Sequence, residues 1–208
     1  AGANLNLING TLDFATGGPF TLVSGVTLNQ TGGSLTGTDN LTFAGTFNWS
    51  NGGSLTGSGS LTTTGTTTLF GTGTRTIVRD WNNDGTLNWD AGGFQLQNGS
   101  TFTNNSIFNV NGTGPLNSTG PGTEVFLNAA TGQFNVNNSL TVNPDQFNNA
   151  GILTLSGSNM LTLSGSTSNT NTWALGTGTL SINVGTHVLN AGTVVTGAGA
   201  NLNLSGGT

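Results

Sequence analysis

Residues 45–65 decide the fold of this chain, and they read G-T-F-N-W-S-N-G-G-S-L-T-G-S-G-S-L-T-T-T-G from Gly45 to Gly65. Three short runs within them alternate apolar and polar residues: Thr46–Trp49, Ser54–Thr56 and Ser60–Thr62. Glycine, serine or asparagine closes each run. Alternation with a period of two between turn-forming residues is typical of β-strands with one buried face. The stretch therefore predicts three strands joined by tight turns.

The same three-strand unit recurs along the chain. Residues 85–90, G-T-L-N-W-D, repeat its opening, and residues 33–37, G-S-L-T-G, repeat its middle part. About ten units of roughly twenty residues cover the 208 residues, and no useful length shows helical periodicity. These units predict an all-β protein, a single parallel β-solenoid segment over residues 1–208, in which each coil contributes three short strands. At about 4.8 Å per coil, ten coils make a rod roughly 50 Å long.

Comparison of the units predicts which residues stack in the core. Phe47, Leu87 and their equivalents share one inward position, and Trp49, Trp89 and their equivalents share a second position two residues later. The predicted core stack consists of Phe47, Trp49, Leu87, Trp89, Phe108, Val110, Phe134, Val136, Leu153 and Leu155, with Val194 as a further member of the Phe47 position. The residues between them, among them Asn48 and Asn88, should point outward, because successive strand side chains alternate.

Two further features concern the connections. Residues 81–85, 147–151 and 188–192 each combine an apolar residue, an asparagine-containing segment and a closing glycine, so we expect a recurring turn with a glycine at positive φ. One unit is about six residues longer than the others, and its excess lies in residues 112–122, which contain Pro115 and Pro121. We therefore expect a loop insertion there.

The composition limits the partners of the chain. Only 4% of its residues are charged, against roughly 25% in an ordinary domain. With Arg75 and Arg79 as the only lysine or arginine residues, we expect no nucleic-acid binding, which depends on neutralising phosphates. No apolar run is long enough for membrane insertion of this segment. The lack of cysteine is compatible with a secreted location.

The two ends of the sequence resemble each other. Residues 1–11 read A-G-A-N-L-N-L-I-N-G-T and residues 198–208 read A-G-A-N-L-N-L-S-G-G-T, 197 positions later. Chance similarity in so biased a composition is one explanation. The other is a super-repeat in a longer protein, and on this second explanation the solenoid continues in both directions.

Several motifs carry a resemblance to a known class of proteins. G-T-F-N-W, G-S-L-T-G-S-G-S-L, F-N-N-A-G and G-T-H-V-L-N-A-G-T resemble the β-strand repeats of large bacterial exoproteins, such as filamentous-haemagglutinin-like adhesins and autotransporter passengers. The resemblance covers nearly the whole chain except residues 112–122. It implies a right-handed parallel β-helix, export to the cell surface, and a role in adhesion or in a surface filament. These repeats have no catalytic motif, so the resemblance implies no functional residues.

One short segment has the pattern of a metal site. Asp80, Asn82 and Asp84, followed by Gly85, match the first half of an EF-hand calcium loop. Ala91 stands where that loop requires a bidentate glutamate. The equivalent segments at 147–151 and 188–192 have no carboxylate, so an ordinary turn without a cofactor is the favoured interpretation.

The carboxylates bear on whether the chain is an enzyme. Polysaccharide cleavage needs two carboxylates across a groove, or a base with a cationic partner. The candidates are Asp13, Asp39, Asp80, Asp84, Asp90, Glu124 and Asp145. Only Asp80 beside Arg79, and Asp84 near Asp90, form a local cluster in sequence. His187 has no serine or acid nearby in sequence with which to form a catalytic triad. A solvated surface cluster is therefore the favoured interpretation.

Three hypotheses for function follow from these patterns. The first is a non-enzymatic extracellular structural solenoid, an adhesin stalk or filament protomer that associates with further copies of itself. The second is a carbohydrate-binding adhesin region that contacts cell-surface or matrix glycans through residues 112–122. The third is a polysaccharide-cleaving β-helix that uses Asp80 and Asp84.

Overall fold

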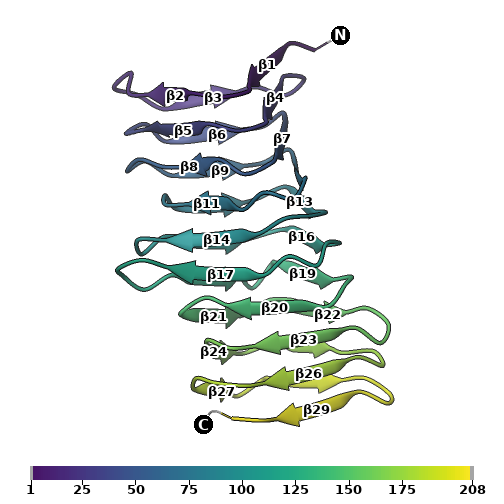
Figure 1. Cartoon of the computed structure of the whole chain (residues 1–208). Coiled ribbons are helices and arrows are strands. Elements are labelled where there is room, and N and C mark those ends of the chain that lie inside the picture. The colour runs from purple at the N-terminus through teal and green to yellow at the C-terminus, as the bar shows by residue number, and fades with distance from the viewer. Residues whose placement is uncertain (1, 207–208) are drawn as a thin grey trace.

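The chain winds into a solenoid of parallel strands (Figure 1). Its structure, a computed structural model, describes residues 2–206. Within these residues there are 29 strands and no helix, so nothing helical is long and apolar enough to cross a bilayer. Strands three apart in sequence pair with each other, and each turn of the solenoid contributes one strand to each of three sheets. The prediction of an all-β parallel solenoid of about ten coils with three strands each is confirmed.

The three sheets run along the whole length of the rod, and strand direction is parallel throughout. Sheet A contains β1 (Asn4–Leu7), β4 (Thr27–Gln30), β7 (Thr46–Ser50), β10 (Thr66–Phe70), β13 (Thr86–Trp89), β16 (Ile107–Val110), β19 (Gln133–Val136), β22 (Ile152–Leu155), β25 (Thr172–Ala174) and β28 (Val194–Thr196). Sheet B contains β2 (Thr11–Phe14), β5 (Ser34–Gly37), β8 (Ser54–Leu55), β11 (Arg75–Ile77), β14 (Phe94–Gln97), β17 (Leu116–Thr119), β20 (Leu140–Asn143), β23 (Met160–Leu163), β26 (Thr179–Ile182) and β29 (Asn201–Leu204). Sheet C contains β3 (Phe20–Leu22), β6 (Leu41–Phe43), β9 (Leu61–Thr63), β12 (Trp81–Asn83), β15 (Thr101–Asn104), β18 (Val125–Asn128), β21 (Gln146–Asn149), β24 (Ser166–Asn169) and β27 (His187–Leu189).

The core is a column of apolar side chains enclosed by the three sheets. In β7, Phe47 and Trp49 point inward and are fully buried, while Thr46 and Asn48 lie on the outer face. Aromatic rings from neighbouring coils pack against each other; the ring centroids of Phe102, Phe108 and Phe126 lie 5.1 to 5.8 Å apart. Each coil thus buries its apolar face on the next, as expected of a solenoid.

The inward positions of sheet A contain the residues that the sequence placed in the core stack. Phe47, Leu87, Phe108, Phe134 and Leu153 lie in one column, Trp49, Trp89, Val110, Val136 and Leu155 lie in the other, and all ten are buried. Val194 was assigned wrongly: Val195 pairs with Trp173, which continues the Phe47 column, and Val194 pairs with Thr172. Adjacent valines give no alternation from which the inward residue can be read.

The asparagine-rich segments after Trp81 and Phe147 form strands, where turns had been predicted. Asn83 and Asn149 close β12 and β21, and their side chains are buried. The third segment was also misaligned by one residue, because His187 pairs with Thr167 and Leu189 with Asn169. The sequence predicts turns here because a buried asparagine at an inward position interrupts the apolar alternation that is typical of a strand.

The glycines that follow these strands are required by close packing between coils, and positive φ was the wrong explanation for two of the three. Gly85 and Gly151 do not have positive φ, whereas Gly192 does, at 91°. A Cβ at Gly85 would overlap the carbonyl oxygen of Gly65 in the preceding coil, and one at Gly151 would overlap that of Gly132. The stacked backbones leave no room for a side chain at this corner.

Residues 112–122 do not form one continuous loop insertion as predicted, because this segment contains a strand. β17 (Leu116–Thr119) continues sheet B between β14 and β20. Leu116 pairs with Phe94 and Val142, and all three are buried. The additional residues therefore lie in the turns on either side of β17, where Pro115 and Pro121 are found and are exposed.

The similar sequences at the two ends occupy different sheets. The string N-L-N-L forms β1 in sheet A near the N-terminus and β29 in sheet B near the C-terminus. The two strings are therefore not structurally equivalent in the described part of the chain. Ala1, Gly207 and Thr208, which belong to the eleven-residue match, lie outside the described residues.

Candidate functional site

The residues of the proposed calcium loop lie along a strand and do not converge. Asp80 and Asp84 flank the three residues of β12, so four steps of extended chain, on the order of 13 Å, separate them. Asp80 Oδ1 accepts a hydrogen bond from the backbone N–H of Thr101 at 2.8 Å, and Asp84 Oδ1 accepts one from Asn105 Nδ2 at 2.7 Å. In residues 2–206, no three histidine, aspartate or glutamate side chains are grouped as metal ligands would be. The carboxylates thus bind the neighbouring coil.

Four of the nine charged residues gather at the corner between sheets B and C, which sequence proximity does not reveal. Each lies two residues before the first inward residue of a sheet C strand, so register stacks them in one column. These residues are Asp39, Arg79, Glu124 and Asp145. Three of them, Asp39, Arg79 and Glu124, are nearly fully buried. The column is the largest concentration of charge in the described chain.

Asp39 forms the end of this column nearest the N-terminus. Its carboxylate accepts hydrogen bonds from the hydroxyl and the N–H of Thr16, at 2.7 and 2.8 Å, and from the N–H of Gly17 at 3.2 Å. These bonds, with a smaller contribution from the charge of Arg79, lower the pKa of Asp39. Arg79 itself donates to the carbonyl oxygen of Gly37 at 2.7 Å. This part of the column joins coils and leaves no acid–base pair facing solvent.

Glu124 and Asp145 form a carboxyl pair across two coils. Asp145 Oδ2 accepts the backbone N–H of Glu124 at 3.1 Å, Asp145 Oδ1 accepts the Ser118 hydroxyl at 3.1 Å, and Glu124 Oε1 accepts the N–H of Gly99 at 2.9 Å. Burial and a hydrogen bond to Asp145 raise the pKa of Glu124, while the hydrogen bond from Glu124 lowers the pKa of Asp145. As the pH rises, Asp145 therefore loses its proton before Glu124 does.

The spacing of this pair does not match glycoside hydrolysis. The two carboxyl groups of a glycosidase stand about 5 to 9.5 Å apart, with the sugar or a water between them. Here Asp145 Oδ2 accepts the backbone N–H of Glu124 at 3.1 Å and Glu124 is almost fully buried, so the two carboxyl groups lie together inside one corner. The arrangement can hold a proton between two coils, but it leaves no gap for a scissile bond.

Arg75 lies inside the solenoid. It is fully buried, and its guanidinium group donates to the backbone carbonyl oxygens of Trp49 at 3.1 Å, Ala91 at 2.7 Å and Phe70. Burial lowers the pKa of Arg75 to about 10. Composition identifies this residue only as a cation, but its alternation with Ile77 in Arg75-Thr76-Ile77 is a signal that it points inward.

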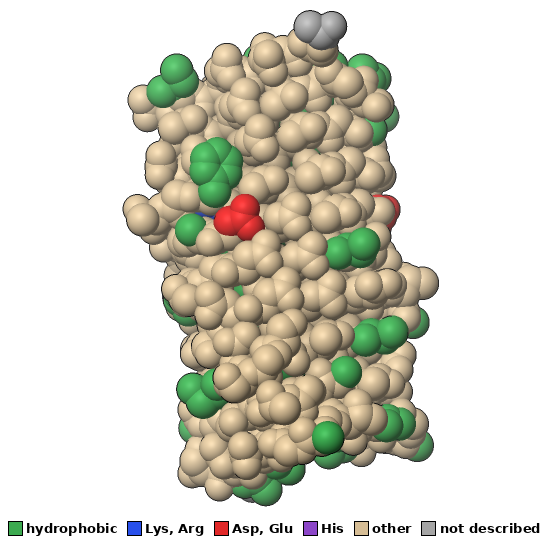
Figure 2. Space-filling view, turned by 90° about the vertical axis from the view of Figure 1, so that its right-hand side faces the viewer, with side chains coloured by type: hydrophobic (Ala, Val, Ile, Leu, Met, Phe, Trp, Pro, Cys, Tyr) green, Lys and Arg blue, Asp and Glu red, His purple; other side chains and the backbone are tan. Residues whose placement is uncertain are grey.

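The outer face of sheet A is a regular polar surface. Asn48 Nδ2 donates to Asn29 Oδ1 at 2.9 Å, and Asn109 Nδ2 donates to Asn88 Oδ1 at 2.9 Å, so that asparagines of adjacent coils form a ladder. Figure 2 shows the side of the rod on which sheet A lies, and it is almost entirely uncharged with scattered hydrophobic side chains. The recurrence of Asn48 along this row makes it one member of a surface array.

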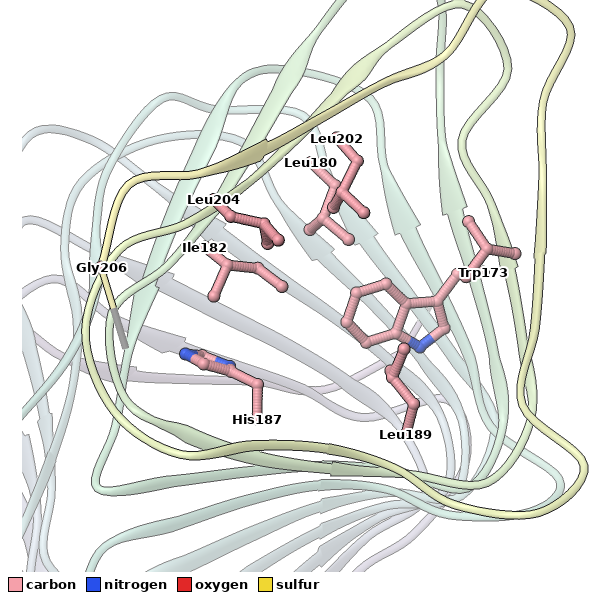
Figure 3. A pocket seen from close by; sticks show the side chains of 9 residues that line it. Trp173, Leu180, Ile182, His187, Leu189, Leu202, Leu204 and Gly206 are labelled. Atoms are coloured by element: carbon pink, nitrogen blue, oxygen red, sulfur yellow. The ribbon is translucent and has the colours of Figure 1, made fainter. Parts of the chain in front are cut away.

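The C-terminal end of the described rod has a large apolar surface. A cavity of about 470 Å³ opens there among Trp173, Leu180, Ile182, Leu189, Leu202 and Leu204. Figure 3 shows these side chains converging on the interior from the three sheets, with His187 at the rim. Leu202 and Leu204 are 57% and 71% exposed, although they continue the inward columns of sheet B. This end is therefore suited to contact another apolar surface.

His187 has structural partners in place of catalytic ones. Its Nδ1 lies 3.0 Å from the Thr167 hydroxyl and its Nε2 lies 2.9 Å from the carbonyl oxygen of Val184. Both ring nitrogens therefore join His187 to its own turn and to the preceding coil.

Comparisons of the chain with protein families, with curated proteins and with solved structures find no match.

Proposed function

We propose that this chain is a non-enzymatic structural segment of an extracellular rod, such as an adhesin stalk or a surface filament. The observation that carries the proposal is the continuity of the rod: parallel sheets join the successive coils of residues 2–206, and one apolar core extends from Phe14 to Ile182. Force along the rod acts on the hydrogen bonds and apolar contacts between successive coils. Resistance to extension is what a stalk requires.

The surface supports a location outside the cell. Asparagine, threonine, serine and glycine make up most of it, and both arginines are buried. Such a surface changes little with pH or ionic strength, because few groups on it titrate or are screened. It also offers phosphate groups no exposed lysine or arginine within the described residues. These properties agree with the resemblance to bacterial exoprotein repeats.

Single-molecule pulling tests the stalk function. The segment, placed between two globular handle domains and stretched from its ends, should lose one coil at a time, with about 65 Å of contour length released per twenty-residue coil. Phe108→Asp should lower the rupture force of the coils next to it, because a carboxylate cannot be buried unpaired in the core. Extension without measurable resistance would contradict a load-bearing role for the wild-type rod.

We also propose that the apolar surface of the last described coil packs against a further solenoid coil, which for the isolated 208-residue chain is the first coil of a second copy. The strands at the two ends have the same direction, so a copy stacked head to tail continues the parallel ladders. Its first coil offers the exposed Leu5 and the half-buried Leu12 to an end that exposes Val195, Leu202 and Leu204. Open head-to-tail contacts of this kind generate filaments.

Light scattering and electron microscopy of the purified chain test this association. Leu202→Asp should give monomers where the wild-type chain gives longer rods. Ile152→Asp, at an exposed residue on the outer face of sheet A, is the matched control and should leave the rods intact. Monomeric wild-type protein at high concentration would contradict end-to-end association while leaving the stalk function open to the pulling experiment.

Carbohydrate binding is the second candidate function. The observation that favours it is a surface depression of about 430 Å³ at the corner between sheets A and B, which Gly112, Thr113 and Gly114 help to line. These residues belong to residues 112–122, the segment for which the sequence predicts glycan contacts.

A further inference from the structure

The corner where the chain passes from sheet A to sheet B is hollowed in four successive coils. Thr72, Asp90, Asn111, Thr113 and Asn138 line the depression of about 430 Å³ with polar side chains. Its floor consists largely of glycine, because the backbones of adjacent coils approach closely: a Cβ at Gly114 would overlap the carbonyl oxygen of Gly92. The same close approach that removes side chains from the floor creates the space above it.

The polar groups beside this depression are held in fixed positions by one another. Ser156 Oγ donates to Asn137 Oδ1 at 2.9 Å, Asn137 Nδ2 donates to Asn111 Oδ1 at 2.9 Å, and Asn111 Nδ2 donates to Asp90 Oδ1 at 2.8 Å. The chain of hydrogen bonds runs in one direction along the rod and ends on the Asp90 carboxylate. Asp90, Asn111 and Asn137 remain exposed, so each keeps hydrogen-bonding capacity toward solvent.

An exposed aromatic ring adjoins the end of this ladder. The backbone N–H of Asp90 donates to the carbonyl oxygen of Leu69 at 2.8 Å, which places Asp90 in the coil next to Phe70 and at the same corner. The Phe70 ring is 42% exposed. Figure 2 shows hydrophobic side chains close to an acidic one near one edge of this face. An aromatic face beside a few fixed polar groups is the usual composition of a small-molecule site.

Arg75 gives the corner its rigidity from inside. Its guanidinium group holds the carbonyl oxygens of Trp49, Phe70 and Ala91, which come from three successive coils at this corner. The backbones that carry Phe70 and Asp90 are thus fixed relative to each other before any ligand arrives. Pre-organisation of this kind lowers the entropic cost of binding.

We propose that this corner site, defined as Phe70, Thr72, Asp90, Asn111, Thr113 and Asn138, binds a neutral polysaccharide chain. Phe70 packs against the C–H face of a sugar ring, and Asp90 with Asn111 hydrogen-bonds to its hydroxyl groups. A neutral ligand fits because both arginines are buried and Asp90 would repel uronic acids or sulfated sugars. Coils repeat about every 4.8 Å, so the ladder presents its groups along the direction of a linear chain. The proposal rests on the carbohydrate-binding function and is independent of the rod function.

An array of linear oligosaccharides tests this site with the intact 208-residue chain. The probes are neutral oligomers of β-linked glucose, mannose and xylose, with oligogalacturonate as the charged counterpart. At least one neutral oligomer should be retained and oligogalacturonate should not. Phe70→Ala and Asp90→Asn should each weaken binding about tenfold or more, the usual cost of losing a central contact.

Matched controls separate a lost site from a lost fold. Ile152→Ala removes an exposed hydrophobic side chain from the outer face of sheet A, and Asp13→Asn removes an exposed carboxylate from β2; both should bind as the wild-type chain does. Circular dichroism should show an unchanged melting temperature for all four variants, since each altered side chain is exposed. Failure of the wild-type chain to retain any neutral oligomer would overturn the proposal, as would full binding by both Phe70→Ala and Asp90→Asn. Neither result would bear on the pulling experiment.

Discussion

At the scale of single residues, the buried arginines show how this chain tolerates charge in its interior. Arg75 donates to the backbone carbonyl oxygens of Trp49, Phe70 and Ala91 at the corner between sheets A and B, and the Phe70 oxygen also accepts the N–H of Asn51. Arginine suits this role because its planar group presents five donors in fixed directions. The residue therefore acts as a cross-link between coils.

Replacing this cross-link should destabilise the rod. Lysine has one nitrogen and cannot reach the carbonyl oxygens of Trp49, Phe70 and Ala91 together, so Arg75→Lys should lower the free energy of unfolding by roughly 2–4 kcal/mol. Denaturant unfolding measures the change. Arg79→Lys is the control and should cost less, because Nε and Nη1 of Arg79 have no hydrogen-bond partner among the described residues. Equal losses for the two variants would contradict the role given to Arg75.

The Glu124–Asp145 pair should control how stability depends on pH. The raised pKa of Glu124 stabilises the fold below the ordinary value of 4.5, and this contribution is lost as pH rises through the folded pKa. The lowered pKa of Asp145 stabilises the fold above 3.8 and is lost as pH falls through its folded value, and Asp39 behaves in the same way. Stability should therefore be highest in mildly acidic solution, where the pair holds one proton.

Melting temperatures between pH 3 and pH 8 check this expectation. The wild-type chain should melt at a lower temperature at pH 8 than at pH 4.5. Glu124→Gln, which keeps a donor toward Asp145 without a titrating proton, should remove most of that difference. Asp13→Asn, in an exposed position, should leave the profile unchanged. A wild-type profile that is flat above pH 4.5 would contradict the raised pKa of Glu124.

At the scale of strands and ladders, two of the asparagine ladders lie in different environments. The inner ladder links Asn83, Asn104, Asn128 and Asn149 at the corner between sheets C and A, with Nδ2 to Oδ1 distances of 2.7 to 2.8 Å. All four side chains are buried. The outer ladder on sheet A has similar distances but is half exposed, so water can replace its bonds.

The two ladders should differ in their contribution to stability. Asn128 Nδ2 also donates to the carbonyl oxygen of Ile152 at 3.1 Å, so Asn128→Ala leaves several buried groups without partners and should cost roughly 2–4 kcal/mol. Asn109→Ala, in the outer ladder, should cost less than about 1 kcal/mol. Chemical denaturation of the two variants compares these values. A larger loss for Asn109→Ala would show that burial does not decide the strength of these ladders.

Much of this element-level structure could be predicted from the sequence. Strict alternation, as in Thr46-Phe47-Asn48-Trp49, identifies strands and their buried face because the two faces of a strand have different environments. Alternation does not reveal the inward orientation of Asn83 and Asn149, since a polar side chain whose hydrogen bonds are made by a ladder of asparagines can occupy an inward position. Their signal was an asparagine two residues after an aromatic residue, repeated at Trp81, Phe102, Phe126 and Phe147.

The candidate sites could be predicted less well, because they depend on pairs from different coils. Glu124 and Asp145 are 21 residues apart in sequence, and the turns around β17 vary in length, so only the register of sheet C brings them together. Phe70 and Asp90 are likewise joined by register. The carboxylates that do lie close in sequence, Asp80 and Asp84, are separated by an extended strand.

At the scale of the whole molecule, the coils stack in one register along the rod. Coil length varies from 19 residues, between Asn135 and Thr154, to 26 residues, between Asn109 and Asn135, yet all three residues lie in one outer column of sheet A. The additional residues of the longer coils lie in the turns between strands and do not change the stacking of the column. Distance along the rod should therefore depend on the number of coils and not on the number of residues.

Pulsed electron paramagnetic resonance, which measures the distance between two spin labels on one chain, tests the equal spacing of the coils most directly. The sequence has no cysteine, so pairs can be introduced at will, with Asn29→Cys combined in turn with Asn109→Cys, Asn135→Cys or Thr154→Cys. The three distances should be about 19, 24 and 29 Å before a constant offset for the label arms, which is an equal step of about 4.8 Å per coil. A step across the 26-residue coil that is clearly larger than the step across the 19-residue coil, or broad distributions without a step, would contradict a continuous parallel solenoid.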